Sequence, residues 1–124
     1  MLVLALSAIW HEGFGQFKKE MYVSDAVETV QSGVTESRNI IRVYYEDFQM
    51  VAIGIESPEG VHEEFTLGPK ISFEGTCEAH QSTMNDERWY IALCSENSEG
   101  VLYVGHTYQK ERMVKFRNLT LMKK

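Results

Sequence analysis

The sequence predicts an α+β fold, namely a curved antiparallel sheet of about seven or eight strands, partly closed or barrel-like, with one main helix near residues 24–32. Three observations lead to this prediction. β-Branched and aromatic residues fill runs along most of the chain, which is typical of strands. Turn-forming residues separate these runs at short intervals, which favours hairpins. A single segment has the spacing and the end residues of a helix.

The predicted helix begins at Ser24, whose hydroxyl can accept a hydrogen bond from a free amide of the first turn. Three valines in and before the segment follow one another at spacings of four and three residues, which predicts one apolar stripe. Gly33 stands where a left-handed residue is expected after a helix. Whether residues 11–23 extend this helix backward or form a strand stays open.

Seven further runs are expected to be strands, and short turns join them. Pro58 favours a tight turn at residues 57–60, and the segment 97–100 has the same Glu-Gly ending. Apolar residues change faces within the last run, which predicts a bulge near Arg117 and Asn118. The predicted strands comprise residues 40–45, 50–55, 61–67, 71–73, 89–94, 101–108 and 113–122.

The length of 124 residues fits a single domain that spans residues 1–124. The apolar run at residues 1–10 is too short for a membrane span, which takes about 20 residues. No Lys or Arg precedes this run, so we expect a first strand there rather than a weak secretory signal. We also expect Cys77 and Cys94 to be reduced thiols, because a chain of this size can form a core without disulfides. These expectations place the protein in the cytoplasm.

Charge is the most uneven property of the sequence. The net charge is −6 in total, yet residues 38–87 contain ten acidic and only three basic side chains. Antiparallel pairing would gather carboxylates of this segment on one outward patch, and such a patch attracts a cationic partner. A solvated face that only keeps the protein soluble is the alternative. The predicted acidic patch consists of Glu46, Asp47, Glu56, Glu59, Glu63 and Glu64.

Two adjacent aromatic residues are candidate anchors for a partner. Tyr44 and Tyr45 face opposite sides of a regular strand, because side chains alternate along it. We therefore expect at least one of them at the surface or in a ligand cavity, where tyrosine is an effective interface anchor.

No motif of catalytic or metal-binding spacing is present in the sequence. Cys77 and His80 form one short pair of ligands, whereas a structural zinc site needs four. His62 beside Glu63 and Glu64 has the groups for acid–base chemistry, so an enzyme that uses a histidine is kept as an alternative. We expect no enzyme activity, no metal and no cofactor.

The C-terminal segment 88–124 is basic, with seven basic and three acidic side chains. Tyr108 and Phe116 lie among them, and basic groups interleaved with aromatic rings can bind single-stranded nucleic acid. The net charge of −6 argues against this role, because nucleic-acid-binding domains are usually basic overall. We therefore expect neither a nucleic-acid partner nor a membrane partner.

These observations favour a small, acidic, non-enzymatic binding protein that acts as an inhibitor. It would occlude a basic, nucleic-acid-handling protein, as toxin immunity proteins and phage anti-defence proteins do, which is a likeness in physics and not in sequence. The alternative is a small-ligand binder, in which the curved sheet holds a nucleotide or metabolite among Tyr, Trp and Arg side chains. Exposed edge strands would also favour a homo-oligomer.

Overall fold

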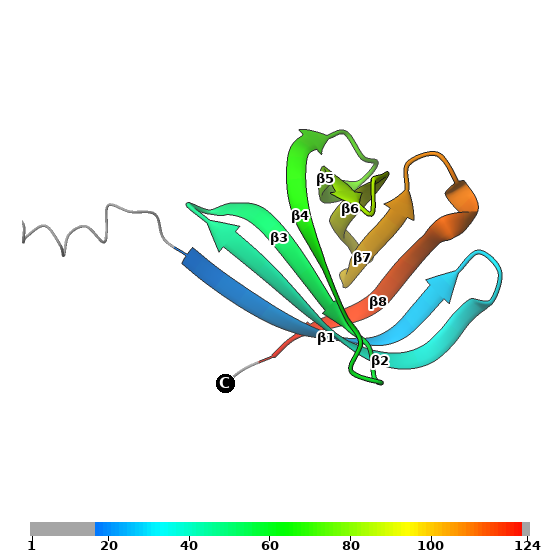
Figure 1. Ribbon diagram of the computed structural model, residues 1–124. Helices are drawn as coiled ribbons and strands as arrows, with labels where there is room; N and C mark the ends of the chain where they lie inside the picture. The colour runs from blue at the N-terminus through cyan, green and yellow to red at the C-terminus, as the bar shows by residue number, and fades with distance from the viewer. Residues whose placement is uncertain (1–16, 123–124) are drawn as a thin grey trace, which may run out of the picture.

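The computed structural model describes residues 17–122, which form one closed barrel of eight antiparallel strands (Figure 1). The strands follow one another around the barrel in chain order, and the last strand pairs with the first. They are β1 (Phe17–Thr29), β2 (Gly33–Glu46), β3 (Gln49–Glu56), β4 (His62–Ile71), β5 (Thr76–Met84), β6 (Glu87–Glu96), β7 (Glu99–His106) and β8 (Met113–Leu121). One 3-10 turn, η1 (Lys110–Arg112), lies between β7 and β8.

The predicted α+β fold is wrong, because the structure contains no α-helix within residues 17–122. Residues 24–32, which were predicted as the helix, form the second half of β1 and the turn into β2. The β1–β2 register shifts between Ser24 and Ala26, where β2 advances by three residues, from Asn39 to Glu36, while β1 advances by two. Val30, the last of the three valines, lies in the turn after β1 and is 59% exposed, so the valines do not form one apolar stripe.

The two residues expected to cap the helix have other roles in β1 and its turn. Ser24 is fully buried, and its hydroxyl donates a hydrogen bond to the main-chain carbonyl of Arg117 on β8 at 2.9 Å. Gly33 has the positive φ that was expected, +68°, but it closes a hairpin. Within the segment left open between strand and helix, residues 17–23 are strand, and residues 1–16 lie outside the described part of the chain.

The hairpins predicted at residues 57–60 and 97–100 are both confirmed. The bulge predicted near Arg117 and Asn118 is also confirmed, since the β7–β8 register shifts opposite these residues and Asn118 has a φ of 56°. Three connections are two-residue turns with positive φ at both central positions, which suits the twist of antiparallel strands. These turns are Asp47-Phe48, Asn85-Asp86 and Asn97-Ser98.

The core of the molecule is the interior of the barrel, which apolar side chains from all parts of the wall fill. Their alternation along each strand follows the two-residue period of a sheet. Each fully buried residue of this kind stabilises the fold by about 1.5–3 kcal/mol relative to exposure. The buried members are Ile41, Val43, Met50, Ile53, Ile55, Phe65, Trp89, Ile91, Leu102, Val104 and Phe116.

A second, smaller apolar cluster lies on the outer face of β5, β6 and β7. Phe73, from the connection between β4 and β5, covers it, and the Phe73 ring lies 5.5 Å from the Tyr90 ring and 5.4 Å from the Tyr103 ring. A disulfide joins Cys77 of β5 to Cys94 of β6 within this cluster, with the two Cα atoms 4.1 Å apart. The expectation of two reduced thiols is therefore wrong, because strand pairing places the two side chains opposite each other.

Tyr90 of β6 can lie flat on the barrel only because its neighbour on β7 is a glycine. A Cβ atom at Gly105 would come within 2.2 Å of the Tyr90 ring. Replacing Gly105 by alanine should therefore displace Tyr90 from Phe73 and lower the free energy of unfolding by about 1–3 kcal/mol. Urea unfolding, followed by circular dichroism, measures the change.

Gly54→Ala is the matched control, because Gly54 is also in a strand but its added Cβ would meet no atom closer than 3.9 Å. The control should keep its stability or gain about 0.4–1 kcal/mol, since alanine restricts the unfolded chain. Equal losses in the two variants would show that the contact between Tyr90 and Gly105 does not determine the packing of this face.

The disulfide should contribute measurably to stability because it closes a loop between positions 17 residues apart. The chain-entropy model gives about 3 kcal/mol for a loop of this length. Reductant should therefore lower the urea midpoint of the wild-type protein, and should leave a Cys77→Ala/Cys94→Ala variant unchanged. Two thiols that react with a thiol reagent in the untreated native protein would contradict the disulfide.

Candidate functional site

A cavity of about 340 Å³ opens at the end of the barrel that carries the β1–β2, β3–β4 and β5–β6 turns and η1. In Figure 1 the β1–β2 and β7–β8 connections lie on this same side, at the right. Apolar side chains, several of them core residues, line most of the cavity: Ile55, Phe65, Met84, Trp89, Val104, Met113, Val114 and Phe116. Polar side chains contribute the remainder, and these are Thr29, Gln31, Glu63, Glu111 and Arg112.

Arg112 connects η1 to the barrel wall. Its guanidinium donates to both carboxylate oxygens of Glu87, at 3.2 and 3.3 Å, and to the side-chain oxygen of Gln109 at 3.1 Å. The guanidinium carbon also lies 5.0 Å from the centre of the Trp89 ring, a cation–π distance. The hydrogen bonds from Arg112 hold the pKa of the Glu87 carboxyl below its ordinary value. Arg112 is therefore already neutralised at the rim of the cavity.

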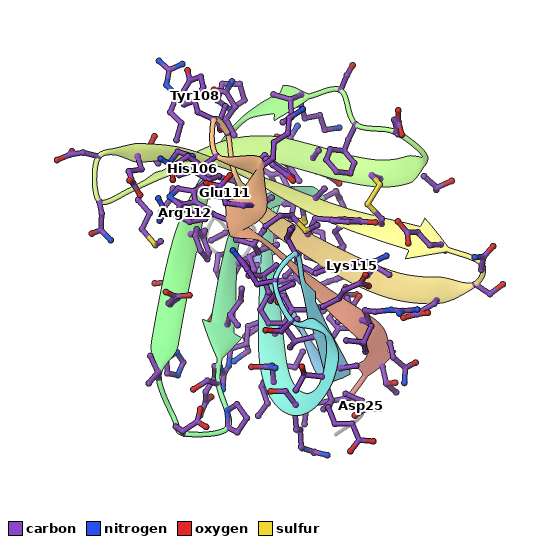
Figure 2. The ribbon with its side chains drawn as sticks, turned by 90° about the vertical axis from the view of Figure 1, so that its right-hand side faces the viewer. Asp25, His106, Tyr108, Glu111, Arg112 and Lys115 are labelled. Atoms are coloured by element: carbon purple, nitrogen blue, oxygen red, sulfur yellow. A yellow bond between two sulfur atoms is a disulfide. The ribbon has the colours of Figure 1, made fainter. Side chains whose placement is uncertain are left out.

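His106 holds the segment that leads into η1. Its Nδ1 accepts hydrogen bonds from the main-chain N–H groups of Tyr108, at 3.1 Å, and Gln109, at 3.0 Å. An acceptor nitrogen carries no proton, so the neutral ring has its proton on Nε2, which lies 3.8 Å from Glu87. The ring is buried and meets Trp89 edge-on at 5.2 Å. Figure 2 shows His106, Tyr108 and Arg112 grouped around η1.

Two carboxylates complete the rim of the cavity, Glu63 at the start of β4 and Glu111 in η1. Within residues 17–122, neither takes part in an ion pair or a side-chain hydrogen bond. Trp89 has an unsatisfied group as well, because its buried Nε1–H finds no acceptor in the same part of the chain. The rim therefore combines unpaired acceptors with an apolar, aromatic interior.

Polar side chains occupy the interior at the opposite end of the barrel. The Tyr22 hydroxyl donates to Glu20 at 2.9 Å, and burial together with this carboxylate raises the pKa of Tyr22. Burial and Glu20 also raise the pKa of Tyr45 to about 12. His80 is buried, and its Nε2 lies 2.9 Å from a carboxylate oxygen of Glu78. This end thus offers a hydrogen-bonded network instead of an apolar cavity.

The six carboxylates of the predicted acidic patch do not lie together, because β3 separates them into two groups. An eight-residue strand such as β3 spans roughly 23 Å. The groups are Glu46 and Asp47 before β3, and Glu56, Glu59, Glu63 and Glu64 at its far end and beyond it.

The second of these groups is itself divided. Glu56 forms an ion pair with Arg42 at 3.1 Å, and lies 3.4 Å from the His62 ring. Glu63 lines the cavity, whereas its neighbour Glu64 faces the other side of β4. The predicted residues are therefore distributed over several surfaces of the barrel.

The two candidate aromatic anchors point to opposite sides of β2. Tyr45 packs against the barrel core, and Lys18 lies 5.3 Å from the centre of its ring. Tyr44 contacts Phe17, with the ring centres 6.4 Å apart. Both lie toward the end of β2 that is distant from the cavity, so neither contributes to it.

The basic residues of β8 are matched by carboxylates of the same chain. Lys115 lies 3.1 Å from Glu96, whose pKa is lowered by hydrogen bonds from Tyr103 and Lys115. Arg117 contacts Glu99 at 3.3 Å and Glu28 at 3.6 Å. These pairs lie on the outer face of the barrel and reduce its positive charge there.

Residues 17–122 contain no group of three or more His, Cys, Asp or Glu side chains that could hold a metal ion. In the same range, no helix has the length and apolar character that a bilayer crossing requires. Comparisons of the chain with protein-family models, with curated proteins and with solved structures found no match. Function is therefore inferred from the cavity and its chemistry.

Sequence reasoning did not identify the rim of the cavity. Glu111 was not predicted at a site, because its position depends on how the connection before β8 folds back over the barrel. Glu63 was predicted as part of the acidic patch, and in the structure it lines the cavity, on the same face of β4 as Phe65.

Arg112 should control the order of η1. Replacing it with glutamine removes the contacts with Glu87 and Trp89, so amides at Tyr108 and Gln109 should exchange a few-fold faster. In a Trp10→Phe background, which leaves Trp89 as the single tryptophan, the emission should shift to longer wavelength as water reaches the ring. Hydrogen exchange and fluorescence are the two measurements.

Arg88→Gln is the control for this experiment. Arg88 is exposed on β6, and its hydrogen bond to the Tyr108 hydroxyl is long, at 3.5 Å. The control should therefore match the wild-type protein in both measurements. Identical behaviour of the two variants would mean that the Arg112 contacts do not hold η1 in place.

Proposed function

We propose that this protein binds a small, largely apolar ligand in the cavity at the η1 end of the barrel. The observation that carries the proposal is the cavity itself, about 340 Å³ in volume and lined mainly by core side chains. Eight-stranded barrels are wide enough to hold one small ligand. Ligand sites typically measure about 300–1,000 Å³ and combine an apolar lining with a few polar groups.

The size and lining of the cavity indicate the kind of ligand. A volume near the lower end of that range suits a compact molecule better than a long lipid chain. Phe65, Trp89 and Phe116 offer aromatic surfaces, against which a flat or ring-shaped body can pack. The polar groups stand at the rim, where they would orient the ligand.

The connection before β8 is already ordered around the cavity. His106 and Arg112 hold it through hydrogen bonds to main-chain and side-chain groups. A loop that is held in place before binding loses little entropy when a ligand arrives. This preorganisation favours a binding role for the site.

The contacts of the two histidines near this end of the barrel also favour binding over catalysis. The Nδ1 of His106 is occupied by two main-chain amides. His62 stands on the outer side of the hairpin, 3.4 Å from Glu56. Neither histidine presents a free nitrogen to the cavity in this arrangement, so we propose binding without turnover.

The inhibitor hypothesis stays a prediction that has not been tested. It depended on a single acidic patch, and the six carboxylates lie on several surfaces. No specific observation among the described residues favours it over ligand binding. The disulfide Cys77–Cys94 supports an oxidising compartment, and we propose that setting in place of the cytoplasm.

The test uses N-phenylnaphthylamine, a neutral apolar fluorophore whose emission rises on leaving water. Wild-type protein should bind one equivalent saturably, and bound probe should raise the melting temperature. Met113→Trp fills part of the cavity and should weaken binding at least about tenfold, because the added ring competes with the probe for the same space.

Met21→Trp is the matched control, since Met21 is half-buried like Met113 but does not line the cavity. It should bind the probe as the wild-type protein does. Absence of saturable binding, or equal loss in both variants, would refute the proposed function.

A further inference from the structure

The cavity mouth carries an excess of negative charge. Glu63 and Glu111 line the cavity, and within residues 17–122 no positively charged group pairs with either. Arg112 also lines it, but its guanidinium is bound by both oxygens of Glu87. Glu63, Glu87 and Glu111 contribute three negative charges and Arg112 contributes one positive charge. These four residues therefore leave the mouth with a net charge of −2.

An anionic ligand would meet this mouth unfavourably. Its charge would face Glu63 and Glu111, and the positive charge of Arg112 is already paired with Glu87. A cation would be attracted to the mouth, because two carboxylates lie at the edge of a low-dielectric interior. Charge interactions are stronger there than in water.

The interior offers a ligand an aromatic surface and one unsatisfied hydrogen-bond donor. The Trp89 ring is already in a cation–π contact with Arg112 at 5.0 Å, so it offers a ligand an aromatic surface for packing and not a second site for positive charge. The indole N–H of Trp89 has no acceptor within the described range, although the side chain is about nine-tenths buried. An unsatisfied donor in a cavity-lining side chain indicates that a further molecule completes the site, through an acceptor in its body and not through its amine, because an ammonium group only donates.

We infer that the cavity selects compact ligands with an apolar body and one cationic amine, whose charge lies at the mouth beside Glu63 and Glu111. This inference rests on the proposed function and adds the chemical class of the ligand. The aromatic lining holds the body, and the two carboxylates hold the amine.

Three probes with the same indole body separate charge from shape: tryptamine is a cation at neutral pH, tryptophol is neutral and indoleacetate is an anion. Calorimetry on the full chain at low salt should show tryptamine binding about tenfold more tightly than tryptophol, with indoleacetate weakest. Raising the salt concentration should narrow the preference, because the carboxylates are exposed and their field is screened.

Variants then identify the carboxylates. In Glu63→Gln/Glu111→Gln, tryptamine and tryptophol should bind within about twofold of each other, while the tryptophol affinity stays at the wild-type value. Glu59→Gln/Glu64→Gln is the matched control, because these carboxylates belong to the same hairpin region but do not line the cavity. The control should keep the full preference for tryptamine.

The outcomes distinguish this inference from the function on which it rests. Equal binding of the three probes, or tightest binding of indoleacetate, would overturn the cationic ligand class and leave the cavity as a binding site. Binding of N-phenylnaphthylamine without binding of tryptamine would do the same. Failure of every probe would overturn both proposals.

Discussion

Pairing between β8 and β1 is the interaction on which the rest of the structure depends. It brings Leu121 opposite Tyr22 and Val114 opposite Thr29, and so joins the two ends of an eight-strand meander. An open sheet would leave main-chain donors and acceptors unpaired along both outer strands and one apolar face in water. Closure removes both costs and encloses the core. It also creates the cavity, because an interior that is closed around its circumference can be entered only at an end.

The edge strands that would favour a homo-oligomer are thereby paired with each other, and self-association stays untested.

Local features of this fold are readable in the sequence, and features that depend on closure are not. The turns at residues 57–60 and 97–100 and the bulge at Arg117 follow from residue types within a few positions. The helix prediction failed for a related reason: the valine spacing includes Val30, which lies exposed in the turn after β1, and Ser24 has the chemistry of a cap. Only the distant partner, β8, gives that serine its actual role. The disulfide likewise depends on the register of β5 and β6 and not on cysteine spacing.

The sequence also did not predict which charged residues lie together at the candidate site. The acidic composition of residues 38–87 is real, but composition does not say which way each carboxylate points. Glu56 and Glu87 are paired with arginines, whereas Glu63 and Glu111 meet from separate parts of the chain at one opening. The number of acidic groups was therefore less informative than their pairing. Trp89 and Arg112 belong to residue types expected around a ligand, yet their contact across the mouth required the folded connection before β8.

The chain-order meander has a consequence for how the barrel forms. Seven of the eight strand pairings join sequence neighbours, several through two-residue turns, so most native contacts are local. Such hairpins can form early, because closing a short loop costs little entropy. The pairing of β8 with β1 is the exception, since it must bring together segments from opposite ends of the described chain. We expect the pairing of β8 with β1 to form last. The folding rate should then be more sensitive to substitutions on β1 and β8 than to substitutions on any other pair of strands.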